Sequence, residues 1–115
     1  MSPGTKMKVY LSGSITKKDG YKKDFEEAER ILRDCGYDTI NPATFGGTVP
    51  LEYHEYIKRD LQALLECDYI CFVNDVTTSK GALIERIVAQ ETGVQEIALE
   101  DCENIRWLVE HGKKG

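Results

Sequence analysis

Residues 68–74 read Asp-Tyr-Ile-Cys-Phe-Val-Asn, and this stretch decides the fold class of the chain. Five apolar or aromatic side chains follow one another between Asp68 and Asn74. A strand that is covered on only one face alternates apolar and polar residues, whereas a strand covered on both faces is apolar throughout. The stretch therefore predicts a buried strand of a parallel sheet.

Strand and helix patterns alternate on both sides of this stretch. Further short strands are predicted at residues 9–11, 37–40 and 94–99. Helical spacing of apolar residues lies between and after the strands, at Phe25, Ala28, Ile31, Leu32 and Cys35, at Tyr53, Tyr56, Ile57, Leu61, Leu64 and Leu65, at Ile84, Ile87 and Val88, and at Ile105, Leu108 and Val109. Short connections force right-handed crossovers, so we predict an α/β fold: a doubly wound, flavodoxin-like open parallel sheet of four to five strands with helices on both faces.

Several residues mark the ends of the predicted helices. Gly36 and Gly93 follow the first and third helical patterns and favour helix termination there. The hydroxyls of residues 77–79 offer caps for the start of the third helix, and Asp101 can cap a final helix.

Length and composition limit the classes of protein. The chain has 115 residues, of which 41% are hydrophobic, so we expect residues 1–7 to be a flexible leader and residues 8–115 to form a single domain. The net charge of −5 repels a nucleic-acid backbone. No apolar run approaches the ~20 residues that cross a bilayer. We therefore expect neither a nucleic acid nor a membrane as partner.

The four cysteines are Cys35, Cys67, Cys71 and Cys102, and they lack the Cys-x-x-Cys spacing of zinc or redox sites. We interpret all four as free thiols, which favours a reducing, cytoplasmic location. Cys67 and Cys71 are four residues apart and are either core residues or a metal-binding pair. The sequence otherwise indicates no metal and no cofactor.

Ligands of such sheets bind at the carboxyl ends of the strands, so the segments that follow the strands hold the candidate residues. Ser12-Gly13-Ser14 directly follows the first strand. Its backbone N–H groups, with the hydroxyls of Ser12, Ser14 and Thr16, form either a ring around an anion or a simple turn. The basic cluster at residues 17–23 is either a solvated face or an attraction for a substrate phosphate.

Two carboxylates stand out in the predicted helices. Asp60 falls on or beside an apolar stripe, where a buried carboxylate is costly unless paired. It is either functional or a boundary residue held by Lys58, by Arg59 or by a helix-end hydrogen bond. Glu85 lies in the first turns of a helix whose N-terminus points at the ligand edge, where the helix dipole favours the ionised form. It is either catalytic or a compensation of that dipole. Gly81, one turn earlier, leaves space for a ligand above the Glu85 carboxylate.

Four short motifs follow one another along residues 8–99. They are Val9-Tyr10-Leu11-Ser12-Gly13-Ser14-Ile15, Arg59-Asp60-Leu61, Cys67-Asp68-Tyr69-Ile70 and Ser79-x-Gly81-x-x-x-Glu85. Together they resemble the nucleoside 2-deoxyribosyltransferase superfamily. The Gly-Ser-Ile start is similar to that of the 2'-deoxynucleoside 5'-phosphate N-hydrolases, whereas the Asn41-Pro42 turn and the short length resemble a compact phage and bacterial branch.

The resemblance implies an enzyme that hydrolyses or exchanges the N-glycosidic bond of a nucleoside or nucleoside 5'-monophosphate, without a metal. It implies that Glu85 is the nucleophile, Asp60 its carboxylate partner and Tyr10 a hydroxyl that orients the nucleophile. A 5'-phosphate would meet Gly13, Ser14, Ile15 and Ser79. Phosphate-preferring relatives often carry an arginine soon after Gly-Ser-Ile, whereas residues 16–18 of this chain are Thr-Lys-Lys. A lysine would therefore supply the positive charge for the phosphate.

Two more residues are expected at the substrate: Asn41, in the turn after the second strand, and Asp75, which contacts a base edge or is an exposed loop aspartate. Relatives pair through the second and third helices. Because Tyr53, Tyr56 and Leu65 add apolar area there, we expect a homodimer or a dimer-based assembly.

Two other function classes fit the same segments. One is a non-catalytic nucleotide-binding or sequestering module, which would return its ligand intact. The other is a flavodoxin-like FMN carrier, whose phosphate loop is also rich in Ser, Thr and Gly after the first strand and whose purified form is yellow.

Overall fold

The computed structural model describes residues 7–13, 21–45, 51–74 and 79–102. The strands are β1 (Lys8–Ser12), β2 (Asp38–Ile40), β3 (Tyr69–Phe72) and β4 (Gln95–Glu96). The helices are α1 (Tyr21–Asp34), the 3-10 helix η1 (Pro42–Thr44), α2 (Tyr53–Leu65) and α3 (Lys80–Thr92).

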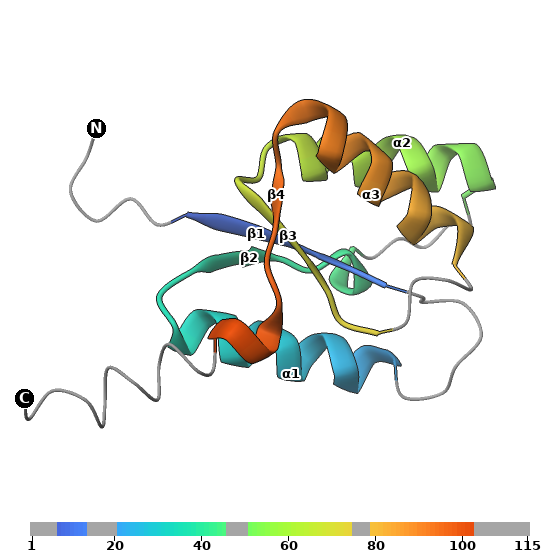
Figure 1. Ribbon diagram of the computed structural model, residues 1–115. Helices are drawn as coiled ribbons and strands as arrows, with labels where there is room; N and C mark the ends of the chain where they lie inside the picture. Colours follow the sequence, from blue (N-terminus) through green and yellow to red (C-terminus); the bar gives the residue numbers. More distant parts are fainter. Residues whose placement is uncertain (1–6, 14–20, 46–50, 75–78, 103–115) are drawn as a thin grey trace, which may run out of the picture.

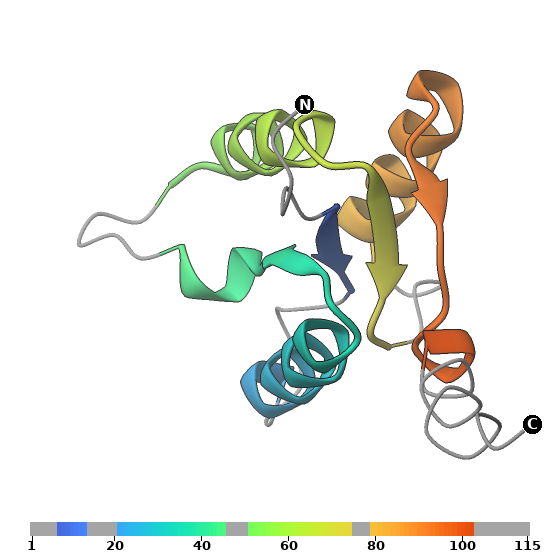
Figure 2. The same ribbon diagram turned by 90° about the vertical axis from the view of Figure 1, so that its left-hand side faces the viewer.

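The four strands form one parallel sheet in the order β2-β1-β3-β4. Helices α2 and α3 lie side by side on one face, and α1 lies on the other face together with the helical residues 99–102 (Figures 1 and 2). This order is that of the flavodoxin-like doubly wound folds, so the predicted fold class is confirmed. Within the described ranges, no helix is long and apolar enough to span a membrane.

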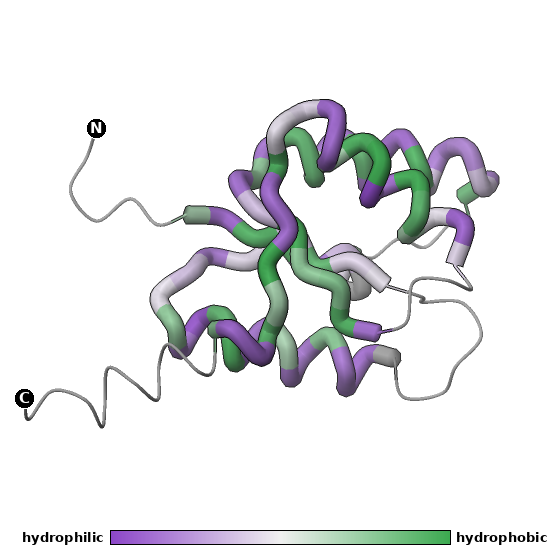
Figure 3. Tube along the Cα trace, viewed as in Figure 1, coloured by the Kyte–Doolittle hydropathy of each residue, from purple (hydrophilic) through white to green (hydrophobic). Residues whose placement is uncertain are grey.

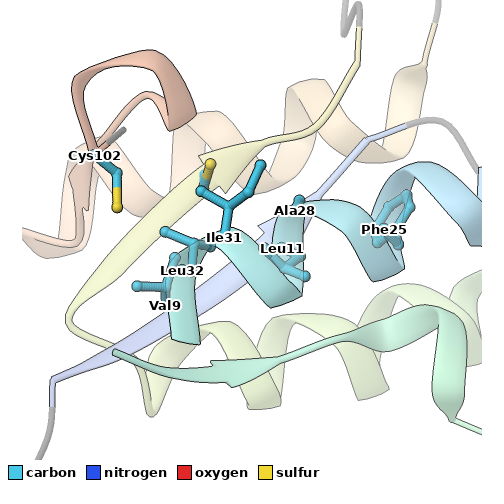
Figure 4. Close-up of a cluster of buried hydrophobic side chains, with 8 residues drawn as sticks. Val9, Leu11, Phe25, Ala28, Ile31, Leu32 and Cys102 are labelled. Atoms are coloured by element: carbon cyan, nitrogen blue, oxygen red, sulfur yellow. The ribbon is translucent and has the colours of Figure 1, made fainter. Parts of the chain in front are cut away.

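Strand β1 lies in the interior of the sheet and sends alternate side chains to opposite faces. Val9 and Leu11 point toward α1, where they join a buried cluster of eight residues, most of them labelled in Figure 4. That cluster consists of Val9, Leu11, Phe25, Ala28, Ile31, Leu32, Cys71 and Cys102. The period-2 alternation therefore leaves Tyr10 and Ser12 for the face covered by α2 and α3.

The core on the second face is built around Tyr10, which is fully buried. Its buried neighbours are Leu64, Cys67, Ile70, Ala89 and Val94. Figure 3 shows hydrophobic residues along the inner strands of the sheet and at intervals along the helices. The hydroxyl groups of Tyr10 and Ser12 thus lie in a largely apolar environment, where a polar group needs a partner.

The predicted ends of α1 and α3 are confirmed. Ser79 caps α3 by accepting a hydrogen bond of 3.2 Å from the backbone N–H of Ala82. Gly93, with φ of +82°, ends α3 in the left-handed conformation that glycine adopts without strain. Gly36 follows α1 with φ of +98°. The prediction for Asp101 is wrong, because residues 99–102 are already helical and Asp101 lies inside that segment.

The prediction of four free thiols is wrong for Cys35 and Cys102. These two residues form a disulfide with Cα atoms 6.6 Å apart, because the end of α1 and residues 99–102 pack on the same face of the sheet. Cys67 and Cys71 are free and buried. They belong to the cores on opposite faces, so they are core residues and do not form a metal-binding pair.

Helix α2 buries less of its apolar stripe than its spacing predicts. Tyr53 and Leu65 are 52% and 54% exposed and add apolar area to the surface of the helix. Leu65 directly follows the fully buried Leu64, and neighbouring residues of a helix point in different directions, so Leu65 lies outside the covered stripe. The fully covered positions of α2 are Asp60 and Leu64.

Candidate active site

Three elements bring polar side chains together on the α2/α3 face of the sheet. Strand β1 supplies Tyr10 and Ser12, helix α3 supplies Glu85, and helix α2 supplies Asp60. Glu85 is only 6% exposed and Asp60 only 8%. Two buried carboxylates on neighbouring helices are costly, so each needs hydrogen-bond donors or a cation.

Both oxygens of the Glu85 carboxylate accept a hydrogen bond from β1. The Tyr10 hydroxyl donates to Oε2 at 2.6 Å, and the Ser12 hydroxyl donates to Oε1 at 2.5 Å. Because each oxygen has its own donor, the plane and direction of the carboxylate are fixed. The orienting hydroxyl implied for Tyr10 by the resemblance is thus in contact with Glu85.

Burial raises the pKa of Glu85 from 4.5 to about 7. The hydrogen bonds from Ser12 and Tyr10 oppose this rise, and the negative charge of Asp60 adds to it. From the sequence we expected the helix dipole to favour the ionised form, but loss of solvation outweighs it. Burial also raises the pKa of Tyr10, so its phenol stays protonated and acts as a donor.

Asp60 is held by the neighbouring Arg59, not by Lys58. The Nε atom of Arg59 donates a hydrogen bond of 3.0 Å to Oδ1 of Asp60, and Nη2 forms an ion pair with the same oxygen at 3.0 Å. Burial nevertheless raises the pKa of Asp60, and the hydrogen bonds and charge of Arg59 oppose that rise. Asp60 is therefore a buried carboxylate that is paired with Arg59 and electrostatically coupled to Glu85.

The segment that was expected to bind an anion is described only at its start. Ser12 is committed to Glu85 and does not contribute its proton to an anion ring. Gly13 meets the end of β3, since a Cβ atom on it would lie 2.7 Å from Oδ1 of Asn74. A side chain here would have to displace that of Asn74, and the φ of +157° is rare for residues with a Cβ atom, so glycine is favoured at this position. Ser14, Ile15 and Asp75 lie outside the described residues.

Gly81 and Asn41 are placed in different surroundings. A Cβ atom on Gly81 would make an ordinary contact of 3.7 Å with Ile57, so packing against α2 does not require glycine. Asn41 is 4% exposed, and its Nδ2 atom lies 3.4 Å from Oε1 of Glu29 in α1. Asn41 therefore belongs to the wall between β2 and α1 and not to the group around Glu85.

A cavity of about 540 Å³ lies at the β2 edge between α1 and α2. Its lining consists of Glu29, Arg33, Thr39, Ile40, Asn41, Thr44, Phe45, Arg59, Gln62, Ala63 and Glu66. Neither Glu85 nor Asp60 is among the described residues that line this cavity. The cavity therefore does not include the two carboxylates. Arg59 lines the cavity and also pairs with Asp60.

Sequence reasoning missed two features of the site. It assigned Ser12 to an anion instead of to Glu85, and it considered Arg59 only as a holder of a boundary residue. The available signal for Arg59 was its position directly before a carboxylate on an apolar stripe. In the described part of the chain, no group of three or more His, Cys, Asp or Glu side chains is arranged to hold a metal ion.

Comparison with solved structures identifies enzymes of the same fold. The CMP N-glycosidase BcmB of Clostridium botulinum is 26% identical with a TM-score of 0.58, over 79% of this chain and 66% of that protein. The chain therefore spans just under two thirds of that glycosidase. A 2-deoxyribosyltransferase of Bacillus psychrosaccharolyticus is 20% identical with a TM-score of 0.63, over 79% of this chain and 70% of that protein, and it shows the fold alone.

Sequence comparison gives a family but no characterised relative. None of the curated proteins is significantly similar to the chain. Residues 7–98 match the family described as "Domain of unknown function (DUF4406)". This range includes β1, where Tyr10 and Ser12 lie, and both helices that carry the carboxylates. The chain thus belongs to the DUF4406 family, within a fold shared with an N-glycosidase and a 2-deoxyribosyltransferase.

Proposed function

We propose that this protein breaks the N-glycosidic bond of a nucleoside or nucleoside 5'-monophosphate, by hydrolysis or by deoxyribosyl transfer, with Glu85 as the nucleophile. The observation that carries the proposal is the Glu85 carboxylate, buried and aligned by the hydroxyls of Tyr10 and Ser12. Burial raises the pKa of this group to about 7, so its ionised form is accessible near neutral pH. A desolvated, fixed carboxylate is suited to attack an anomeric carbon.

In the first step an ionised oxygen of Glu85 forms a bond to C1' of the sugar, and the bond from C1' to the base nitrogen breaks. The electron pair of that bond stays on the base, which takes up a proton from solvent water as it leaves. In the second step water attacks C1', the ester to Glu85 breaks, and Asp60 accepts the proton of the water. A second base in place of water gives transfer instead of hydrolysis.

The substrate contacts follow from where the strands end. A 5'-phosphate is expected at Gly13, Ser14 and Ile15, next to the N-terminus of α3 and Ser79, because backbone N–H groups and a helix dipole favour an anion there. Asp75 follows β3 and is assigned to the base edge. Gly81 leaves room above Glu85, whereas Asn41, which the sequence assigned to the substrate, lies against Glu29 of α1 and is left out of the proposed contacts.

The experiment is a panel of ribo- and deoxyribonucleosides and their 5'-monophosphates, incubated with the protein and analysed for free base by chromatography. The wild-type protein is expected to release base from at least one compound, and Glu85→Gln is expected to release none. Glu29→Gln is the matched control, because Glu29 also accepts side-chain hydrogen bonds but lies in α1, away from Asp60. Base release by Glu85→Gln would contradict the proposal.

Two other outcomes identify the alternative functions. A ligand that binds and returns intact after long incubation indicates a nucleotide-binding or sequestering module. A yellow purified protein indicates an FMN carrier. Neither result is compatible with Glu85 as a nucleophile.

A further inference from the structure

The guanidinium group of Arg59 lies between two aromatic rings. Its central carbon is 4.8 Å from the ring centroid of Phe45 and 5.1 Å from that of Tyr56. Tyr56 belongs to α2, whereas Phe45 directly follows η1, so the two rings come from separate elements. Rings at these distances attract a cation through their electron-rich faces. The rings therefore hold the guanidinium at one place.

This position matters because of the contact that Arg59 makes with Asp60. Neighbouring residues of a helix point about 100° apart and do not face each other. Arg59 must fold back along α2 for its Nε and Nη2 atoms to reach Oδ1 of Asp60 at 3.0 Å. The cavity of about 540 Å³ beside Arg59 offers space for other directions of this long side chain. The aromatic pair selects the folded-back direction.

Asp60 is faced by ionisable groups from three elements. Arg59 contacts it from its own helix α2, and Tyr10 of β1 and Glu85 of α3 interact with it through their charges. Among the described residues, Arg59 is the cation of this group. Its removal would leave two carboxylates and a phenol in a buried site, which strongly disfavours a second negative charge.

We propose that Arg59 is a positioning residue, clamped by Phe45 and Tyr56, which keeps Asp60 ionised and directed so that it can accept a proton while Glu85 serves as the nucleophile. The proposal rests on the proposed function for its catalytic consequence. Its structural part, the control of Asp60 by a clamped guanidinium, can be tested without any substrate.

The first measurement is the titration of the Asp60 carboxyl carbon by NMR in protein labelled with ¹³C. Arg59→Gln is expected to move the pKa of Asp60 upward, since burial already raises it and the opposing cation is lost. Arg33→Gln is the matched control, because Arg33 lines the same cavity but contacts Glu29 and Thr39 instead. An unchanged Asp60 titration in folded Arg59→Gln would overturn the proposal.

Two further variants separate the charge from the clamp. Arg59→Lys keeps the charge without the planar fork and is expected to move the pKa of Asp60 less than Arg59→Gln does. Phe45→Leu keeps the arginine and removes one ring, and it is expected to move the pKa of Asp60 in the same direction as Arg59→Gln. If Arg59→Gln does not fold, Phe45→Leu serves as the test in its place. An Asp60 pKa unchanged in Phe45→Leu would overturn the clamp.

The second measurement is a double-mutant cycle on base release. Arg59→Gln is expected to lower kcat by about tenfold or more with a smaller change in KM, because a positioned acid–base group contributes at least that much. In the Asp60→Asn background, Arg59→Gln is expected to cause no further loss. An undiminished loss in that background would overturn the positioning role. If the wild-type protein releases no base while the NMR result holds, the proposed function fails and the control of Asp60 stands.

Discussion

The hydroxyl of Ser12 donates a hydrogen bond of 2.5 Å to Oε1 of Glu85, across 73 positions of the chain. This contact ties the end of β1 to the second turn of α3 in a buried environment. A hydrogen bond to a carboxylate is strongest when the carboxylate is ionised. Ser12 therefore lowers the pKa of Glu85, against the rise that burial causes. The sequence alone assigns Ser12 to an anion loop.

Ser12→Ala is expected to shift the acidic limb of the rate profile to higher pH. Loss of the hydroxyl removes the largest influence that lowers the pKa of Glu85. A nucleophile must be ionised, so kcat/KM should fall more at pH 6 than at pH 9. The measurement is kcat/KM for base release from pH 5 to pH 9.5. Ser12→Thr keeps a hydroxyl and serves as the control, and an unmoved limb in Ser12→Ala would contradict the assignment.

Glu85→Gln is expected to stabilise the fold at alkaline pH relative to the wild type. The pKa of Glu85 is raised in the folded state, from 4.5 to about 7, so wild-type stability falls as pH rises through this window. The difference corresponds to on the order of 3 kcal/mol, which glutamine avoids because it carries no charge. Urea unfolding of both proteins at pH 5 and pH 8 measures this difference in the free energy of unfolding. Equal pH dependence of both proteins would contradict the burial of an ionisable Glu85.

The architecture could be predicted from local patterns, because each pattern determines its own element. The apolar run at residues 68–74 predicted the buried strand β3, and Ser79 and Gly93 predicted the ends of α3. The contents of the site depend on contacts between distant segments. Spacing placed Glu85 near the start of a helix, but it could not show that Tyr10 and Ser12 lie against it or that burial outweighs the helix dipole.

The cysteines show the same limit. Spacing along the sequence could not predict the pairing of Cys35 with Cys102, because these residues are 67 positions apart and meet only when residues 99–102 pack beside α1. Because Cys35 and Cys102 are paired, the cysteines no longer support the prediction of a reducing location. Asp60 was recognised as unusual from its position on an apolar stripe, whereas the two rings around its partner Arg59 follow from the fold.

Ser14→Asp is expected to weaken binding of nucleoside 5'-monophosphates by about tenfold or more, because a negative charge beside the expected phosphate replaces a hydroxyl donor. Ser14 lies outside the described residues, next to Gly13. Calorimetric titration with a monophosphate and with the matching nucleoside separates phosphate recognition from a general loss of binding. The nucleoside should bind equally to both proteins. Equal monophosphate affinity would mean that the segment is only a turn.

The protein is expected to form a homodimer through α2 and α3. The outer faces of these helices expose Tyr53 and Leu65 on α2 and Leu83 and Ile87 on α3, and Ile87 is 60% exposed. Exposed apolar side chains on two neighbouring helices favour a self-complementary interface. Light scattering at micromolar concentration should give twice the mass of one chain. Ile87→Glu should shift the mass toward the monomer, whereas Met7→Glu, which changes an exposed residue before β1, should not.

Asp60→Asn is expected to slow base release without abolishing it, whereas Glu85→Ala should lose several powers of ten in rate, each tenfold step being about 1.4 kcal/mol of barrier. Asparagine keeps the shape and some hydrogen bonding of Asp60 but cannot accept a proton, so the water that attacks the glycosyl ester is no longer assisted. The ester to Glu85 should then accumulate.

Mass spectrometry of digested Asp60→Asn, quenched in acid during turnover of a slow substrate, should find the mass of the sugar on the peptide that contains Glu85. The same peptide from Glu85→Gln is the control and should remain unmodified. Because attack by water is slowed more than attack by Glu85, the fraction of modified peptide should be larger in Asp60→Asn than in the wild type. An adduct on another residue would place the nucleophile elsewhere, and it would leave the buried, doubly hydrogen-bonded Glu85 as a structural carboxylate.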